Sequence, residues 1–308
     1  MLAEKIIKRV NKFLFDRASK GVLNTPQCNL TSNTDYQIVI VSQVYSAAVM
    51  MTLLALKSFI LNLKIKVRLD LIDDGSLTET DKEIYKQHFS EVNIIPMDSV
   101  ELNGCPQGGC WERLCYILKV AKTDYVIQVD TDTLTINNLS EIEECIANNT
   151  AFVISGPKWL SPIPAVEMAK TAQSWKNPHV QSSAESLFDE LESIDLIEYC
   201  RGCAAFASFP KGIDMMPELS KFSKEMEQKL GASKWNEWGS EQLSSNVIIS
   251  LTDKPSILPW PKYQNYGFPF DDNLDITEFS VIHFVGSHRY DKGTYKRLAK
   301  KVITNLSV

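Results

Sequence analysis

The sequence predicts an α/β fold, with a doubly wound, Rossmann-like mixed sheet and helices on both of its faces, in a single domain. Three observations support this. Apolar segments that fit strands alternate with amphipathic segments that fit helices. Two of these strands end in acidic residues, at 73–74 and 130–132, and active sites of open α/β sheets lie beyond the carboxyl ends of strands. The chain of 308 residues is 44% hydrophobic, which allows a large core.

Apolar periodicity predicts each element in turn. In the first half we expect helices at 3–18, 47–61, 80–89, 111–122 and from 140, and strands at 38–41, 67–72, 92–95 and 125–129. The second half is less regular. There we expect strands at 151–155, 203–209 and 279–285, and helices at 184–192, 241–251 and 295–306.

Composition limits the function. The formal net charge is −6 and the pI is about 5.4, which argues against nucleic-acid binding because that needs basic surfaces. The sequence shows neither a secretory signal nor an uninterrupted run of eighteen apolar residues. We therefore expect a cytoplasmic protein. The seven cysteines include a C-x-x-C pair at 200 and 203, which is compatible with zinc but fits reduced packing thiols better.

The segment 3–18 is amphipathic. Its apolar and basic side chains fall on different faces, with Ile6, Ile7, Val10, Phe13 and Leu14 on one and Lys5, Lys8, Arg9, Lys12 and Arg17 elsewhere. The apolar face either packs on the domain or contacts a partner or the inner surface of a membrane.

The most informative motif is Asp130-Thr131-Asp132, which ends the apolar strand 125–129. Carboxylates two residues apart on an extended chain point the same way. They can share a hard divalent cation, which would offset the cost of placing charge at the end of a buried strand. The alternative is an exposed acidic turn. We predict a metal–diphosphate site here.

The order of the elements, with Asp73-Asp74-Gly75-Ser76 after one strand and the D-x-D motif after a later one, resembles the GT-A-fold glycosyltransferases. The resemblance covers residues 36–295. It implies that Asp73 and Asp74 bind the nucleoside, since carboxylates at a strand end accept hydrogen bonds from ribose hydroxyls or a base N–H. A solvated turn would use the same residue types.

A late motif narrows this resemblance to the retaining glycogenin and bacterial lipo-oligosaccharide galactosyltransferase type, known as family 8. In that type a histidine completes the metal site, a glycine lets the diphosphate approach, and a lysine three residues later binds phosphate. Here His283 and Gly286 match, Arg289 replaces the lysine, and the usual Pro-Trp is absent. Asp130, Asp132 and His283 would thus bind Mn²⁺, or Mg²⁺. A core histidine is the alternative.

Two further segments resemble the same family. Arg113, in the apolar helix 111–122, matches an arginine that contacts the donor sugar, although a surface arginine would look alike. Glu241-Gln242 resembles an Asp-Gln pair on the sugar-facing side, which makes both residues catalytic candidates. Glu241 could instead be an acid favoured at a helix N-terminus.

The resemblance implies a hexosyltransferase that uses a nucleotide-sugar, with UDP as the expected nucleotide, and a glycan, lipid or protein acceptor, with retention at the anomeric carbon. Residues 1–34 would be an N-terminal helix and loop. Residues 35–150 would bind the nucleotide-sugar and 151–308 the acceptor, within one domain at 35–308.

Other functions stay open. Residues 129–133 also match the D-x-D-x-T signature of haloacid-dehalogenase-type phosphatases, in which Asp130 would be the nucleophile and Asp132 the general acid. That motif usually follows the first strand, whereas here it follows roughly the fourth. Such phosphatases also need a later Gly-Asp pair after an apolar strand, and here Asp271-Asp272 follows residues 268–270, which make a poor strand. A sugar nucleotidyltransferase would need a glycine-rich loop after the strand at 38–41, which is missing. A non-catalytic nucleotide-sugar-binding protein remains possible.

Overall fold

The structure is a computed structural model that describes residues 2–30, 38–269 and 274–307. The chain forms two units whose segments alternate along the sequence. Unit 1 contains Met1–Pro96, Val129–Glu143 and Pro259–Val308, and unit 2 contains Met97–Gln128 and Glu144–Leu258. Because the segments interleave, the units are not two successive domains. The boundary expected at 34 and 35, and the Asp271-Asp272 pair, lie outside the described residues.

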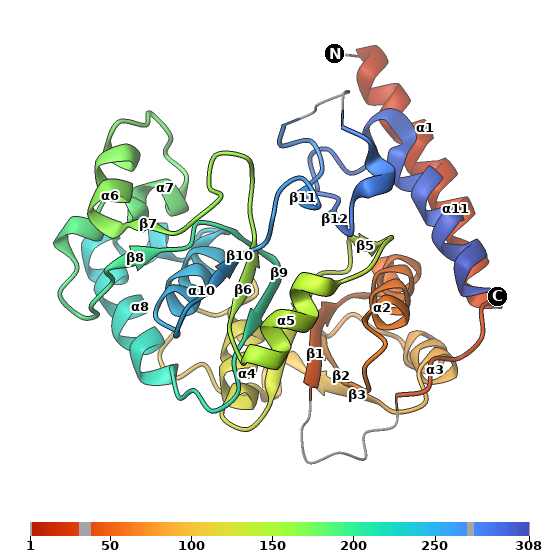
Figure 1. The fold of residues 1–308 in the computed structure, drawn as a ribbon, viewed down its shortest axis with the longest axis horizontal. Coiled ribbons are helices and arrows are strands. Elements are labelled where there is room, and N and C mark those ends of the chain that lie inside the picture. Colours follow the sequence, from red (N-terminus) through yellow and green to blue (C-terminus); the bar gives the residue numbers. More distant parts are fainter. Residues whose placement is uncertain (1, 31–37, 270–273, 308) are drawn as a thin grey trace. The chain divides into compact units, whose positions relative to one another are not determined.

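Unit 1 is built on three parallel strands connected by helices (Figure 1). In chain order these elements are β1 (Ile38–Val44), α2 (Val49–Leu63), β2 (Arg68–Asp73), α3 (Glu79–His88) and β3 (Val92–Pro96). Most buried positions of β1 and β2 are apolar, as expected for strands covered by helices, and Ser42, Asp70 and Asp73 are the buried polar exceptions. Thr78 and Asp81 form a capping box that starts α3.

Helix α2 is the apolar centre of unit 1. The segment Ser46–Leu63 is long and apolar enough to cross a membrane, with a mean hydropathy of 1.7, but 67% of it is buried inside the protein. It packs against β5 and α11. Its one lysine, Lys57, is buried but has polar partners, since its Nζ donates to the carbonyl of Pro26 (2.6 Å) and lies 3.0 Å from Nδ1 of His88. The packing is that of a core helix.

A second, three-stranded sheet in unit 1 has the order β11-β12-β5, from β11 (Tyr263–Asn265), β12 (Val281–His283) and β5 (Thr133–Thr135). Strand β12 runs parallel to β11 and antiparallel to β5. The register sets Asn265 beside His283, and His283 beside Thr133. The sheet therefore brings the late histidine next to the D-x-D motif, about 150 residues away in sequence.

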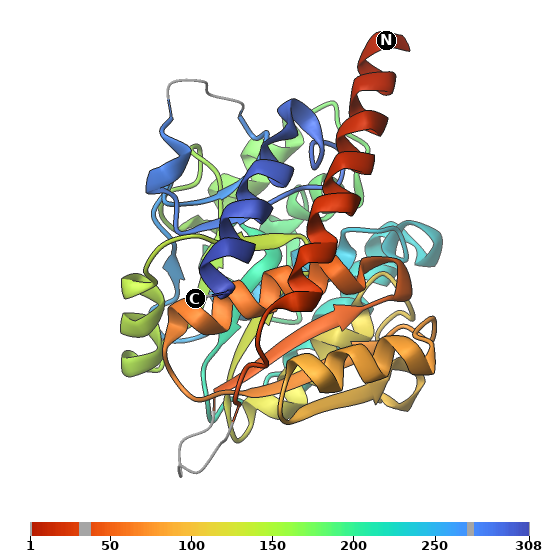
Figure 2. The same ribbon diagram turned by 90° about the vertical axis from the view of Figure 1, so that its right-hand side faces the viewer.

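Two helices near opposite ends of the chain lie side by side in unit 1, α1 (Leu2–Ser19) and α11 (Thr294–Leu306) (Figures 1 and 2). The ring of Phe15 in α1 stacks on Tyr295 in α11, with centroids 4.1 Å apart. Both rings are buried. This aromatic contact attaches the N-terminal helix to the unit.

Unit 2 contains the strand order β10-β6-β9-β4. Its strands are β4 (Tyr125–Val129), β6 (Phe152–Ile154), β9 (Cys203–Phe209) and β10 (Ser256–Ile257). Strand β10 is parallel to β6 and β6 is antiparallel to β9, so the sheet is mixed. The helices α4 (Trp111–Ala121) and α10 (Ser240–Ser250) pack on β9. Before β9, a Cβ on Gly202 would lie 2.8 Å from the carbonyl of Ile154, so only glycine fits there.

The remaining elements are shorter or peripheral. They are α5 (Ser140–Asn148), β7 (Ile163–Pro164), α6 (Ala165–Gln173), α7 (Val180–Glu185), β8 (Glu198–Tyr199), α8 (Met216–Leu230), α9 (Ala232–Trp235) and the 3₁₀ helices η1 (Lys20–Asn24), η2 (Ser46–Ala48), η3 (Met97–Ser99), η4 (Phe188–Glu190), η5 (Ile276–Glu278) and η6 (Asp291–Gly293).

The predicted α/β class with a mixed sheet flanked by helices is confirmed. The helix expected at 184–192 is wrong, because α7 ends at Glu185 and Phe188 turns into a 3₁₀ segment to pack on the ring of Tyr199 (4.9 Å). The late strand is shorter than expected and covers Val281–His283.

Candidate functional site

Asp130, Asp132 and His283 come together in unit 1. Each offers one ligand atom, and these atoms all lie within 4.8 Å of one another. Asp132 and His283 are buried and Asp130 is half-buried. The turn after β4 places the carboxylates, because the backbone N–H of Thr133 donates to the carbonyl of Asp130 (3.2 Å) and that of Phe284 to the carbonyl of Asp132 (2.8 Å).

His283 is oriented by a residue that the sequence did not indicate. Its Nδ1 lies 2.7 Å from Oδ1 of Asn265 on the neighbouring strand β11. Since an amide oxygen only accepts, Nδ1 donates in this contact, and Nε2 faces Asp132, 3.4 Å from its Oδ1. Such second partners are typical of metal-ligating histidines. Only the pairing of β11 with β12, a long-range feature, shows this role.

Arg289 contacts the same aspartate, through a hydrogen bond from Nη2 to Oδ2 of Asp132. Burial opposes ionisation of this carboxyl, but His283 and Arg289 outweigh it and lower the pKa of Asp132. Arg289 also donates from Nε to the carbonyl of Phe284 (3.2 Å). The arginine expected to bind phosphate therefore holds one oxygen of Asp132 in this arrangement, while the other faces His283.

This donor set fits a divalent cation. Two carboxylates and one imidazole suit Mn²⁺, and Mg²⁺ with less selectivity. Octahedral ligands about 2.1 Å from such an ion lie roughly 3 Å apart, and the three ligand atoms here lie within 4.8 Å of one another. Asp130 is the most exposed of the three residues.

The Asp73-Asp74-Gly75-Ser76 segment is the turn after β2 in the same unit. Oδ1 of the buried Asp73 accepts from the backbone N–H of Gly75 (2.9 Å), and Oδ1 of the exposed Asp74 from that of Ser76 (2.9 Å). Gly75 has φ +92°, which favours glycine. Asp74 and Ser76 therefore point polar groups toward solvent, and Asp73 holds the turn.

Gly286 lies in the exposed turn after β12. A Cβ at this position would have only Arg289 Nη2 nearby, at 3.9 Å. Its φ is outside the left-handed region, so backbone strain does not require glycine here. The space beside Gly286 is lined by the guanidinium group.

Arg113, Glu241 and Gln242 all belong to unit 2. Arg113 in α4 is buried and its Nη2 lies 3.3 Å from Oε1 of Glu241 in the first turn of α10. The indole N–H of Trp111 donates to Oγ of Ser240 (3.0 Å), which joins the same two helix starts. Arg113 is thus not a surface residue. It is the cation that a buried Glu241 needs.

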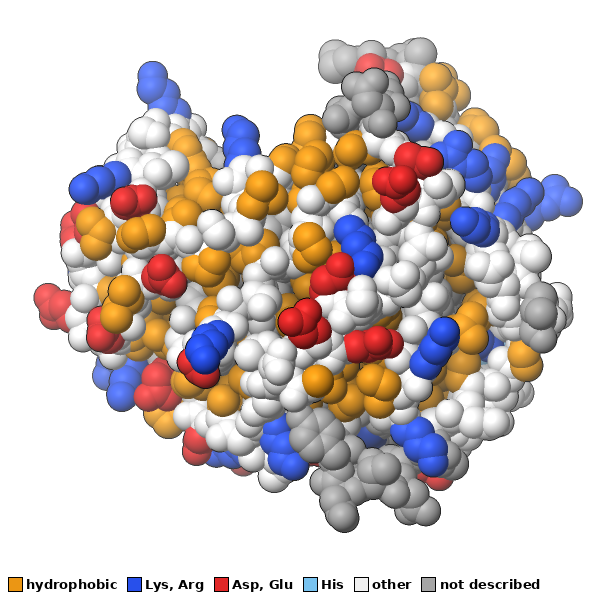
Figure 3. All heavy atoms as spheres, in the orientation of Figure 1, with side chains coloured by type: hydrophobic (Ala, Val, Ile, Leu, Met, Phe, Trp, Pro, Cys, Tyr) orange, Lys and Arg blue, Asp and Glu red, His pale blue; other side chains and the backbone are white. Residues whose placement is uncertain are grey.

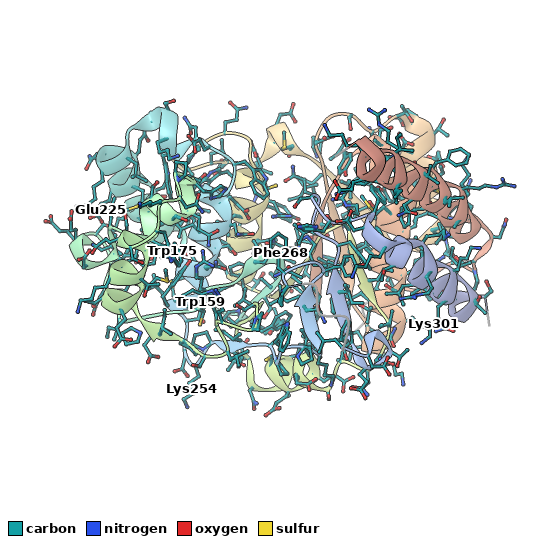
Figure 4. All side chains as sticks on the ribbon, turned by 90° about the horizontal axis from the view of Figure 1, so that it is seen from above. Trp159, Trp175, Glu225, Lys254, Phe268 and Lys301 are labelled. Carbon is teal, nitrogen blue, oxygen red and sulfur yellow. The ribbon has the colours of Figure 1, made fainter. Side chains whose placement is uncertain are left out.

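Gln242 begins a chain of hydrogen bonds in unit 2. It donates to Gln181 (3.1 Å), which donates to the fully buried Glu185 (3.0 Å). Arg201 pairs with Glu185 (2.9 Å), and its guanidinium lies about 5 Å from the ring centroids of two tryptophans, which Figure 4 labels as Trp159 and Trp175. This network, which sequence spacing did not indicate, fixes the Gln242 amide.

Comparisons with known proteins identify the fold. No family model matches the sequence, and no curated protein matches it. Among solved structures, the apo form of the bifunctional glycosyltransferase WbbM matches with a TM-score of 0.53, 16% identity, and coverage of 91% of this chain and 53% of the other. An active-site mutant of LgtC matches with a TM-score of 0.51, 12% identity and coverage of 88% and 96%.

The chain spans about half the length of the WbbM chain and nearly all of LgtC. At these identities the likeness concerns the fold, which is that of the GT-A glycosyltransferases. The resemblance inferred from the D-x-D and histidine motifs is thereby confirmed for the fold.

Proposed function

We propose that this protein is a metal-dependent hexosyltransferase that uses a nucleotide-sugar, with UDP as its nucleotide, and transfers the sugar with retention to a glycan, lipid or protein. The observation that carries the proposal is the Asp130, Asp132 and His283 cluster in a chain with a glycosyltransferase fold.

In this proposal the cation is Mn²⁺ or Mg²⁺, held by the cluster, and when bound it neutralises charge on the leaving diphosphate. Asp130 supplies a half-buried carboxylate, and Asn265 orients His283 through Nδ1 so that Nε2 faces the cluster. Arg289 fixes Asp132 and offers its remaining N–H groups to phosphate oxygens beside Gly286. The exposed Asp74 binds the nucleoside, while the buried Asp73 supports the turn.

For unit 2 we propose that Gln242 is the group that faces the sugar. Its amide is held by Gln181, and a weak nucleophile suffices in a retaining reaction because the departing diphosphate takes the acceptor proton. Glu241 is engaged by Arg113, so service as a base or nucleophile would require that ion pair to open. The predicted halves at 35–150 and 151–308, and a location in the cytoplasm or at the inner membrane surface, belong to this proposal.

The test is donor hydrolysis and transfer with a panel of nucleotide-sugars, with and without Mn²⁺, for the wild type and Asp132→Asn. The variant keeps the shape of the side chain and removes its charge, so we expect loss of both activities with the fold intact by circular dichroism. Turnover near that of the wild type would refute a metal role for Asp132. Release of phosphate from p-nitrophenyl phosphate would favour the phosphatase alternative. Mn²⁺-dependent nucleotide binding without turnover would favour a non-catalytic binding protein.

A further inference from the structure

Helix α1 turns its polar face to the protein. Nζ of Lys8 donates to the carbonyl of Ser287 and lies 3.0 Å from Oδ1 of Asp291. One turn later, Asn11 donates to the carbonyl of Tyr290 (2.9 Å), and Phe15 follows with its aromatic stack. Residues 8, 11 and 15 share one helical face, so hydrogen bonds and one ring hold α1 on unit 1.

The apolar face of the same helix points into solvent. The exposed fractions are 52% for Ile6, 59% for Ile7, 50% for Val10 and 65% for Phe13. An amphipathic helix that packs on its own domain buries such a stripe. The expectation that this face packs on the domain is therefore not met, and a contiguous apolar ridge stands on the surface. The first turns of α1 also stand clear of other elements (Figure 2).

Basic side chains border this ridge. Helix α1 has five basic and two acidic residues, and the adjacent α11 has four basic and no acidic ones, in a chain whose net charge is −6. Lys5, Arg9 and Lys12 are exposed on α1. On α11, Figure 4 labels the exposed Lys301. Hydrophobic and basic side chains alternate along this edge in Figure 3. The basic charge is thus concentrated where the apolar ridge is exposed.

We propose that the exposed face of α1 binds an anionic membrane surface. The ridge of Ile6, Ile7, Val10 and Phe13 enters the boundary between headgroups and acyl chains, while the lysines and arginines of α1 and α11 contact lipid phosphates. The concentration of positive charge on an acidic protein selects an anionic surface over a neutral partner helix. This inference deepens the proposed membrane location by naming the surface that would bind, and it does not depend on the enzyme activity.

The test is co-sedimentation of the full chain with vesicles of phosphatidylcholine alone, or with 30 mol% phosphatidylglycerol. We expect at least about tenfold stronger binding to the anionic vesicles, weakened by salt. The double variant Ile6→Ser/Phe13→Ser removes two ridge side chains and should lose about tenfold in binding. Lys5→Glu/Arg9→Glu should lose the preference for anionic vesicles.

The matched control is Leu160→Ser/Ile197→Ser, which removes two apolar side chains of unit 2 that are 59% and 72% exposed. It should bind as the wild type does. If the ridge variant binds anionic vesicles as strongly as the wild type does, the proposal is overturned. It is also overturned if sedimentation velocity shows a wild-type dimer that the ridge variant abolishes and the control variant keeps, because the ridge would then bind a second copy of the chain. Hydrolysis of a soluble donor by the ridge variant separates this result from failure of the proposed enzyme activity.

Discussion

Replacing Arg113 with methionine tests the buried ion pair of unit 2. The change removes the cation from beside Glu241, whose side chain is 4% exposed, while that of Arg113 is 5% exposed. Breaking a buried pair by removing one partner costs about 3–5 kcal/mol. We therefore expect Arg113→Met to lower the free energy of unfolding by an amount in this range.

The assay is urea unfolding followed by tryptophan fluorescence, which reports mainly on unit 2 because five of the six tryptophans are there. The control is Lys122→Met, which breaks an ion pair with Asp214 whose side chains are 46% and 59% exposed. Such surface pairs are worth at most about 1 kcal/mol. Equal losses in the two variants would refute the reasoning. Adding Glu241→Leu to Arg113→Met should recover most of the loss.

Three further predictions follow from named contacts. Asn265→Ala removes the partner of Nδ1 of His283, so Mn²⁺ affinity by calorimetry should fall about 10–100-fold; unchanged affinity would show that Asn265 does not orient the ligand. Burial, and then the charge of Lys57, lower the pKa of His88 below its ordinary value of 6.5. The contribution of neutral His88 to stability is therefore present above that pH and is lost as the pH falls. The variant His88→Asn should lose less melting temperature than the wild type between about pH 7 and 5.5, and an unchanged slope would contradict this. Gln242→Ala should lower kcat strongly without abolishing it, and NMR of the product from an α-linked donor should show an α anomer, whereas a β-linked product would contradict retention.

Local periodicity was enough to predict much of the fold. The buried strands β1 and β4 are mostly apolar, and β2 carries Leu69, Leu71 and Ile72 among its charged residues. Helices α4 and α10 were expected within one residue of where they lie. By contrast, α8 was missed. Its sequence is mostly polar, and Pro217 marks its first turn, a position where proline is compatible with a helix. A helix such as α8, in which only a few apolar side chains mark the buried face, is difficult to predict from apolar periodicity alone.

The candidate site divides in the same way. Asp130, Asp132 and His283 were predicted because each is part of a motif, and the structure brings them together. Asn265 and Gln181 were not predicted. They act through the pairing of β11 with β12 and through a side-chain contact across 61 residues, and no local pattern encodes such contacts. The contact of Arg289 with Asp132 is equally non-local.

The measurement that tests the central claim most directly is calorimetric titration of UDP into the wild-type protein, with Mn²⁺ and with excess chelator, repeated on Asp130→Asn/Asp132→Asn. If the cluster binds a cation that in turn binds the diphosphate, each ligand strengthens the other, so UDP should bind far more tightly with Mn²⁺ in the wild type. The double variant should lose this difference. Equal affinity for UDP with Mn²⁺ and with chelator in the wild type would contradict the account.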